Sequence, residues 1–283
     1  MKPLIPAPQA IVPLTPTTAR ERAGARNVAP AARRRPSPKT LAQNSFARNE
    51  RRPLVNIAAD ASVSFGRGVL QGVSDYVNGQ HSWEIQTVLR SHFASARGWA
   101  DCDGAIIADV GWSLGAMIQA RSKYVVSCCA DHPSQTAVVC IDDNAVGAMA
   151  AEHLLECGLE FFAFYGQRGS STCANRDAGF AAALKVQGKD RILCPVSFDP
   201  AVRGNLPHWR SLIQWLRSLP KPVGIMARDD SAAEDLNAAC RRAGIAIPAQ
   251  VAIVGVGDDE LICDTAWSAL SSVDCGYRRI GRA

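Results

Sequence analysis

Charged side chains follow directly after two short apolar runs in the C-terminal third of the chain. The runs are Val223–Ala227 and Val251–Val256, and the side chains are those of Arg228, Asp229, Asp258 and Asp259. An uninterrupted apolar run of this length is typical of a strand buried in a parallel sheet. Because ligands bind outside the carboxyl ends of such strands, these charged groups are predicted to share one ligand-binding rim.

A further candidate is Arg176, which falls in the first turn of the helix predicted over residues 175–186. A cation at the positive end of a helix is unfavourable unless it faces an acceptor. Two interpretations follow: the guanidinium contacts a ligand, or it forms a salt bridge with a neighbouring acid. The pattern favours the ligand contact.

A catalytic alternative rests on the G-x-S-x-G pattern of residues 111–115, which places Ser113 between a predicted strand and a predicted helix. A serine hydrolase of that type needs an acid and then a histidine beyond the last strand. The last histidine is His208, and predicted strands still follow it. We therefore expect a binding protein rather than an enzyme, with the hydrolase as a lesser alternative.

The cysteines and histidines point to no metal or cofactor site. The chain has ten cysteines and five histidines, without a CxxC pair or an HExxH motif. Several cysteines lie inside apolar runs, so we expect no disulfide framework, no metal and no cofactor. No apolar run reaches the ~20 residues that span a membrane, and no secretory signal is recognisable, which predicts a cytoplasmic protein without a membrane partner.

The charge is divided unevenly along the chain. Residues 1–52 hold 11 Lys or Arg against two acidic residues, and they are rich in proline and alanine without helix or strand periodicity. This composition predicts a disordered basic tail. The cluster at residues 33–35 has two interpretations, a nucleic-acid-binding arm or a solvated tail, and prolines interrupt every candidate recognition helix.

From Pro53 onward, apolar runs alternate with segments of helical spacing. Predicted strands at residues 54–59 and 161–165 are followed by predicted helices, as are the two runs described first. Such alternation predicts an α/β fold with parallel, doubly wound sheets.

Four motifs occur in order along this part of the chain. They are F-G-R-G-V-L-Q-G-V at 65–73, D-G-A-I-I-A at 103–108, R-D-A-G-F at 176–180 and A-G-I-A-I-P-A-Q-V-A-I-V-G-V at 243–256. Together they resemble the sugar-sensing domain of bacterial xylose operon regulators, which have the fold of the lac repressor sensor and periplasmic sugar-binding proteins. The resemblance covers residues 54–283.

The resemblance implies two Rossmann-like lobes of the periplasmic-binding-protein-like I type, with a sugar held between them. The tail is then residues 1–52, the first lobe residues 53–157 with 270–283 returning to it, and the second lobe residues 158–269. The implied sugar contacts are Asp142, Arg176 and Asp229, with Ser64, Phe65, Asp109 and Asp258 as further candidates. Carboxylates and planar guanidinium groups suit the vicinal hydroxyls of a sugar.

Two positions depart from the pattern of these regulators. Gly257 stands where they place an aspartate after a strand, and Thr172 where they place an aromatic residue. The resemblance implies a sugar-responsive transcription regulator whose ligand is D-xylose or a related pentose, with DNA as partner and a homodimer as assembly. These regulators continue into a C-terminal helix-turn-helix domain that is not recognisable here, which predicts a truncated regulator that keeps its sensor. A stand-alone sugar-binding protein of the same fold is the alternative.

Overall fold

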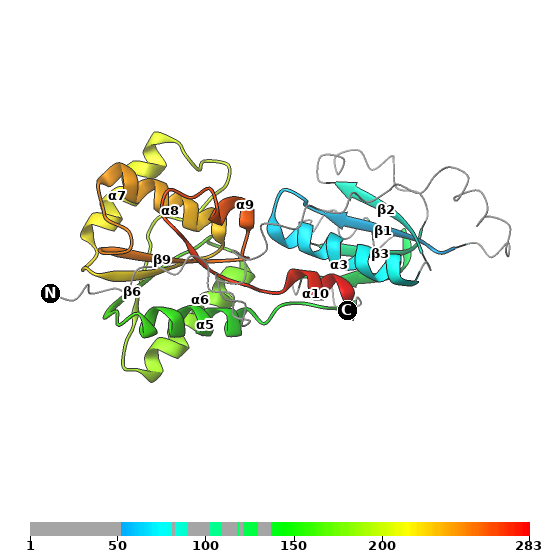
Figure 1. Cartoon of the computed structure of the whole chain (residues 1–283), viewed down its shortest axis with the longest axis horizontal. Coiled ribbons are helices and arrows are strands. Elements are labelled where there is room, and N and C mark those ends of the chain that lie inside the picture. The colour runs from blue at the N-terminus through cyan, green and yellow to red at the C-terminus, as the bar shows by residue number, and fades with distance from the viewer. Residues whose placement is uncertain (1–51, 81–82, 90–101, 109–117, 119–120, 130–136) are drawn as a thin grey trace, which may run out of the picture.

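The computed structural model describes residues 52–80, 83–89, 102–108, 118, 121–129 and 137–283. These residues form two lobes that lie side by side, each built on its own parallel sheet (Figure 1). Residues 1–51 of the basic tail, Asp109 and the Ser113 motif lie outside the described residues. The predicted α/β fold with two Rossmann-like lobes of the lac repressor sensor type is confirmed.

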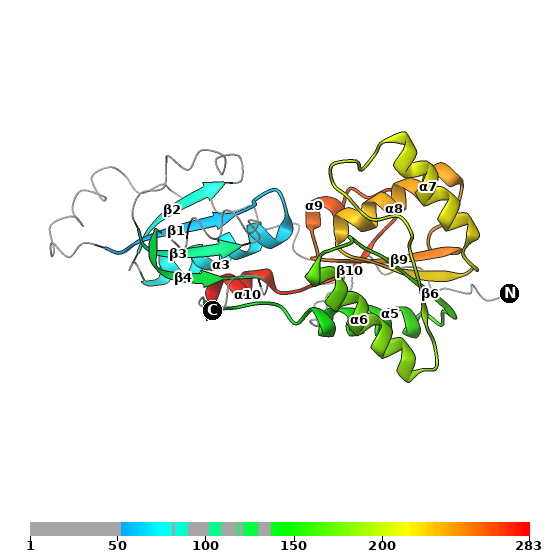
Figure 2. The same ribbon diagram turned by 180° about the vertical axis from the view of Figure 1, so that it is seen from behind.

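The sheet of the first lobe has five parallel strands in the order β2-β1-β3-β4-β5. Their bounds are β1 Leu54–Ala59, β2 Glu84–Leu89, β3 Cys102–Ala108, β4 Ser122–Ser127 and β5 Ala137–Val138. Helix α3 (Ser64–Gln80) packs Val69 and Val73 into the core of this lobe, and α10 (Tyr277–Arg282) lies alongside it. In Figure 2 the strands stand in front of α3.

The sheet of the second lobe also has five parallel strands, in the order β10-β9-β8-β6-β7. Their bounds are β6 Phe161–Tyr165, β7 Arg191–Leu193, β8 Val223–Ala227, β9 Val251–Val256 and β10 Ser271–Val273. The helices are α5 Asp143–Glu156, α6 Ser171–Val186, α7 Leu206–Ser218, α8 Asp230–Ala243 and the short α9 Glu260–Cys263. Helices α5 and α6 cover one face of this sheet and α7 and α8 cover the other (Figure 1).

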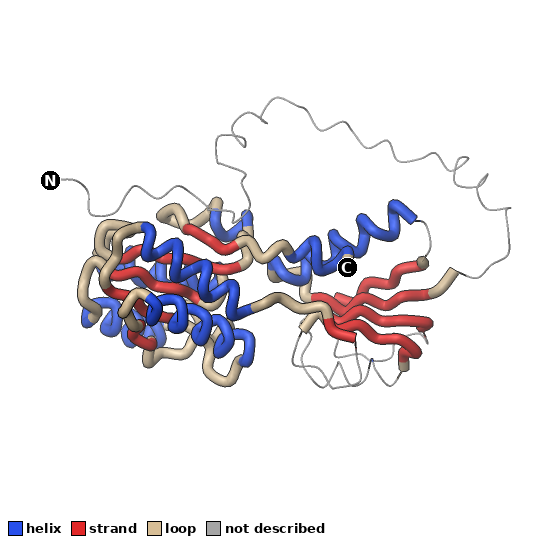
Figure 3. Tube along the Cα trace, turned by 90° about the horizontal axis from the view of Figure 1, so that it is seen from below, coloured by secondary structure: helices blue, strands red, loops and turns tan. Residues whose placement is uncertain are grey.

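The chain passes between the lobes after β5 and again after β10, through the connecting segments visible in Figure 3. The structure differs here from the predicted boundary after residue 157. Helix α5 packs Val146, Ala150 and Leu154 into the core of the second lobe, next to Phe162. Strand β10 likewise pairs with β9, so the chain returns to the first lobe only after Val273. An apolar helix face lies with the sheet that buries it, which sequence periodicity alone does not identify.

Side-chain caps explain where the helices of the second lobe begin. Ser170 accepts a hydrogen bond from the Cys173 N–H and starts α6 four residues earlier than the apolar spacing predicts. Gly244, with a φ of 68°, ends α8 in the left-handed conformation that glycine adopts without strain. The Ser170 cap fixes the turn from β6 into α6 at the carboxyl end of the sheet, whereas Gly244 fixes the turn from α8 towards β9 at the opposite end.

Within the described part of the chain, no helix is both long and apolar enough to cross a membrane. Nor do three or more His, Cys, Asp or Glu side chains of these residues gather as ligands for a metal ion. All ten cysteines fall in the described ranges, and none of them forms a disulfide.

Candidate ligand-binding site between the lobes

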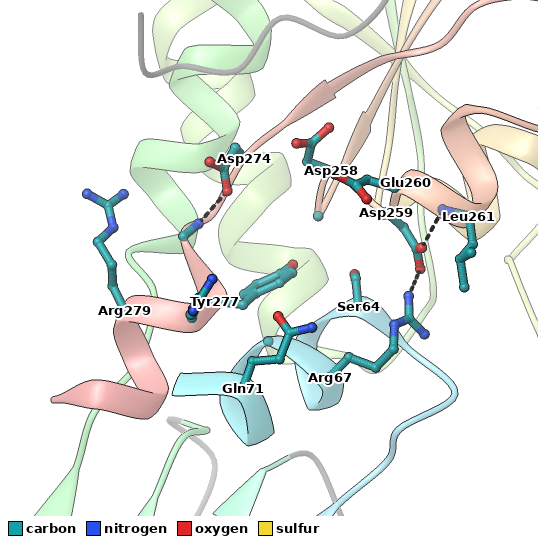
Figure 4. Close-up of a pocket in the computed structure, with 14 residues that line it drawn as sticks. Ser64, Arg67, Gln71, Asp258, Asp259, Glu260, Leu261, Asp274, Tyr277 and Arg279 are labelled. Carbon is teal, nitrogen blue, oxygen red and sulfur yellow. Dashed lines mark hydrogen bonds and ion pairs between the residues drawn. The ribbon is translucent and has the colours of Figure 1, made fainter. Parts of the chain in front are cut away.

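A cavity of about 540 Å³ lies where α3, the turn after β9 and the segment leading into α10 meet (Figure 4). The first lobe lines it with Ser64, Arg67, Gly68 and Gln71, the second with residues 257–261, and the connecting segment with Asp274, Gly276, Tyr277, Arg278 and Arg279. Small-molecule sites commonly measure about 300–1,000 Å³. The cavity is therefore large enough for a monosaccharide, and its walls come from both lobes.

An ion pair at this cavity joins the two lobes. Arg67 Nη2 lies 2.6 Å from Oδ2 of Asp259, which caps the N-terminus of α9 (Figure 4). The Asp259 side chain is only 6% exposed, whereas that of Arg67 is 28% exposed. The backbone N–H of Asp259 donates to Oδ2 of Asp230 at 2.7 Å. The turn after β9 is thus held on its own lobe while its carboxylate reaches the other.

The Asp230 carboxylate holds the turn after β9 in place through hydrogen bonds. Its side chain is buried, and Oδ1 accepts a 2.6 Å hydrogen bond from the Ser272 hydroxyl. The pKa of Asp230 is raised to about 7. Burial is the largest cause, the two hydrogen bonds that the carboxylate accepts oppose the rise, and the neighbouring carboxylates of Asp229 and Asp259 add to it. A carboxyl group that takes up its proton near neutral pH therefore holds one wall of the cavity.

Asp230→Asn is expected to flatten the pH dependence of folding stability. Because its pKa is about 7 in the folded chain and 3.8 for an unperturbed aspartate, Asp230 keeps a proton on folding that the unfolded chain has already released. Its contribution to stability is therefore complete below about pH 4 and is lost as the pH rises towards 7, by up to about 1.4 kcal/mol per pH unit. Urea unfolding between pH 4 and 8 measures this slope.

The asparagine keeps the hydrogen-bond pattern, because its amide can donate to Ser272 Oγ while its oxygen accepts from the Asp259 N–H. Asp264→Asn, at an exposed position beyond α9, is the matched control. Equal slopes for wild type and Asp230→Asn would show that Asp230 binds no extra proton on folding.

Two of the predicted sugar contacts, Ser64 and Asp258, line the cavity. A third, Phe65, packs edge-on against Tyr277 with 5.2 Å between the ring centroids and so supports the cavity wall. Ser64 and Phe65 open helix α3, whereas apolar spacing predicts a helix over residues 66–78, which begins two residues later. Asp258 has a φ of 46°, a left-handed conformation that aspartate adopts more readily than most residues.

Arg176 lies elsewhere, between α5, α6 and the end of β8. It is 5% exposed, with Nε 2.8 Å from Oδ1 of Asp143 and Nη1 2.5 Å from the backbone oxygen of Arg228. In this structure Arg176 therefore forms a salt bridge with a neighbouring acid, which is the second of the two interpretations of this arginine. Its role as a ligand contact stays a prediction.

The two remaining candidates cap helices. Asp142 accepts a hydrogen bond from the Ala145 N–H at 3.0 Å and begins α5, and Asp229 accepts one from the Ala232 N–H at 2.8 Å and begins α8. Neither residue lines the cavity in this structure. Both lie where the chain enters a helix of the second lobe, and their role in binding is likewise a prediction.

Known proteins match this chain both in sequence and in fold. Residues 151–283 match a family model described as a periplasmic binding protein-like domain. A solved structure of a xylose-binding transcription activator superposes with a TM-score of 0.70 and 23% identity, covering 82% of this chain and 61% of the other. The chain thus has the fold of this activator, and its residues 151–283 match the periplasmic binding protein-like domain.

The chain is similar in sequence to xylose operon regulatory proteins. It is 25% identical to that of Escherichia coli strain K12 over 248 residues, which cover 82% of this chain and 61% of the relative. It is 34% identical to that of Haemophilus influenzae over 151 residues, half of this chain and 38% of the relative. The chain thus spans less than two thirds of the length of these relatives, and its resemblance to the xylose-operon-regulator type of sensor is confirmed.

Gly257 has a structural role in this fold. Its φ is 123°, a conformation that side-chain-bearing residues rarely adopt. A Cβ atom here would lie 2.8 Å from Ser64 Oγ and 3.3 Å from Tyr277 Oη. A side chain at 257 would therefore be strained by this φ and would press on the Ser64 hydroxyl, so the glycine favours the close approach of α3 to the turn after β9. Thr172, the other departure, lies in the first turn of α6 and does not line the cavity.

Sequence patterns did not point to Arg67, Gln71 or Tyr277 as site residues. Arg67 and Gln71 lie within the F-G-R-G-V-L-Q-G-V motif, where they read only as polar positions of a helix. Tyr277 follows the last strand and reaches the cavity because the chain crosses back to α3. No periodicity encodes such a crossing, so only the motif could have drawn attention to the two α3 side chains.

Proposed function

We propose that this chain is the ligand-sensing part of a sugar-responsive transcription regulator, with D-xylose or a related pentose as its ligand. The observation that carries the proposal is the cavity whose walls come from both lobes of a sensor fold. Similarity to xylose operon regulatory proteins supports the choice of sugar. Such a regulator acts in the cytoplasm, binds its ligand without chemical change, and works on DNA.

The polar lining suits a neutral, hydroxyl-rich ligand. Asp258 supplies carboxylate acceptors, while Ser64 and Tyr277 offer hydroxyl groups that both donate and accept. Burial raises the pKa of Tyr277 well above its usual value, so its hydroxyl keeps its proton and can donate. A sugar hydroxyl can satisfy donors and acceptors together, whereas an anionic ligand would face the carboxylates of the turn after β9.

Ligand binding in this cavity would couple to the arrangement of the lobes. A ligand that contacts α3 and the turn after β9 at once binds best when the lobes are close together. It therefore shifts the population towards the closed arrangement, and this shift is the signal passed to DNA binding.

Isothermal titration of the purified chain with D-xylose tests the proposal. We expect binding, and we expect Asp258→Asn to weaken it by about tenfold or more, because a charge-assisted hydrogen bond is replaced by a neutral one. Asparagine also adopts a positive φ readily, so the turn is retained. Asp264→Asn, exposed and outside the cavity, is the matched control and should bind as wild type does. A folded chain that binds neither D-xylose, D-ribose nor L-arabinose would overturn the proposal.

A further inference from the structure

The contact between Arg67 and Asp259 differs in kind from the other ion pairs of the described residues. The pairs of Arg176 with Asp143 and of Arg191 with Asp177 lie within the second lobe. Arg67 belongs to α3 of the first lobe and Asp259 to the turn after β9 of the second. Separating the lobes at this edge must break their 2.6 Å contact.

The Arg67 end of the pair is held in place before the contact forms. Its Nη1 donates to the backbone oxygen of Ala61 at 3.2 Å. It stands between two glycines that allow close packing: a Cβ on Gly66 would lie 2.0 Å from the Asp60 oxygen, and one on Gly68 would lie 2.4 Å from the Tyr277 Cβ. The first turn of α3 is therefore fixed against both the β1 loop and α10.

The Asp259 end is equally constrained. Its N–H is bound by Asp230, and its Oδ1 accepts a hydrogen bond from the Leu261 N–H at 3.2 Å as the cap of α9. Only Oδ2 is directed at Arg67. Exposed ion pairs are weak because two long side chains must be ordered to form them. Here both partners are ordered already and one is buried, so the pair retains more of its attraction.

The same edge of the cleft contains the approach of Ser64 to Gly257. Glycine at 257 leaves room for the Ser64 hydroxyl where a side chain would otherwise project. Both approaches are made by residues of the chain itself. The close arrangement of the lobes at this edge is therefore supported by the protein's own groups.

We infer that the Arg67–Asp259 ion pair is a latch that favours the closed arrangement of the lobes without ligand. Where the proposed function holds, the latch also sets ligand affinity, because affinity scales with the fraction of molecules in the binding-competent arrangement. Couplings of this kind typically change affinity 5- to 150-fold. We expect about tenfold for this pair.

The test measures the distance between the lobes in the ligand-free, full-length chain. Spin labels on non-canonical residues at Asn78, exposed in α3, and Val186, 80% exposed at the end of α6, report this distance by electron–electron resonance without labelling the cysteines. Arg67→Met removes the charge and keeps the length of the side chain. Asp259→Asn removes the charge and keeps a side chain that caps helices well. Both variants are expected to shift the distribution to longer distances.

The matched control is Arg191→Met, which breaks a comparable pair inside the second lobe and should leave the distribution unchanged. Combining Arg67→Met with Asp259→Asn should add nothing to either single change. Unchanged distances in both single variants would refute the latch, whatever the chain binds.

Titration with D-xylose gives a second readout. We expect affinity to fall about tenfold in Arg67→Met and in Asp259→Asn, and to be unchanged in Arg191→Met. A distance shift in a chain that binds no sugar would support the latch and refute the proposed function. Sugar binding with unchanged distances would support the proposed function and refute the latch.

Discussion

Asp235→Ala is expected to lower the free energy of unfolding by about 3–5 kcal/mol, which is a large part of the stability of a single domain. Asp235 is 1% exposed, inside the second lobe. It accepts hydrogen bonds from the Tyr165 hydroxyl at 2.7 Å and from Trp209 Nε1 at 3.2 Å, and its Oδ2 lies 2.7 Å from His208 Nε2. The alanine would leave the buried Tyr165 hydroxyl, the buried His208 ring and the half-buried Trp209 indole without their shared acceptor.

The cluster ties α7 and α8 to the end of β6. Tyr165 is the last residue of β6, His208 and Trp209 open α7, and Asp235 is in α8. Burial raises the pKa of Tyr165 far above its usual value, with the charge of Asp235 as the next cause, so the phenol stays protonated and donates. The cluster therefore acts as a structural connection between α7, α8 and β6.

Urea unfolding followed by tryptophan fluorescence measures the effect. Asp235→Asn, which keeps one acceptor oxygen and nearly the same volume, should lose much less than Asp235→Ala. Asp264→Ala is the exposed control and should change stability by no more than about 0.5 kcal/mol. A loss below about 1 kcal/mol for Asp235→Ala would show that the three donors find other partners.

The strands of the second sheet could be predicted from the sequence because they are continuous apolar runs. The three central strands β6, β8 and β9 begin and end at the predicted residues, since a strand buried on both faces shows no alternation and ends where polar residues begin. Edge strand β7 is less clear. The apolar pattern predicts a strand over residues 191–196, but β7 ends at Leu193, shortly before Pro195, which has no N–H to donate.

The cavity could be predicted only in part. Asp258 could be predicted because it follows an apolar strand, and Ser64 because it precedes a motif that resembles a known family. Both predictions depend only on residues that are neighbours in the sequence. Arg67 and Asp259 are 192 residues apart and meet only once two lobes are placed side by side. The position of α5 shows the same limit: its apolar face predicts a helix, but not which sheet the helix covers.

Gly179→Ala is expected to destabilise the second lobe by about 3 kcal/mol, because α5 and α6 cross with their backbones in contact. A Cβ on Gly179 would lie 2.0 Å from the Asn144 backbone oxygen, and one on Gly147 would lie 2.1 Å from that of Arg176. Backbone atoms of packed helices cannot step aside as a side chain can. The helices would have to separate, which would also pull Arg176 away from Asp143.

The matched control is Gly79→Ala, which is expected to raise the free energy of unfolding rather than lower it. Gly79 lies near the end of α3 with nothing within 4 Å of an added Cβ, so Gly79→Ala should gain up to about 1 kcal/mol from the better helix propensity of alanine. Urea unfolding of the two variants beside wild type separates the two effects of one chemical change. Stabilisation by Gly179→Ala would mean that α5 and α6 are not in backbone contact. If the free energy of unfolding rises for Gly79→Ala and falls for Gly179→Ala, close packing of α5 against α6, rather than helix propensity, explains the need for glycine at position 179.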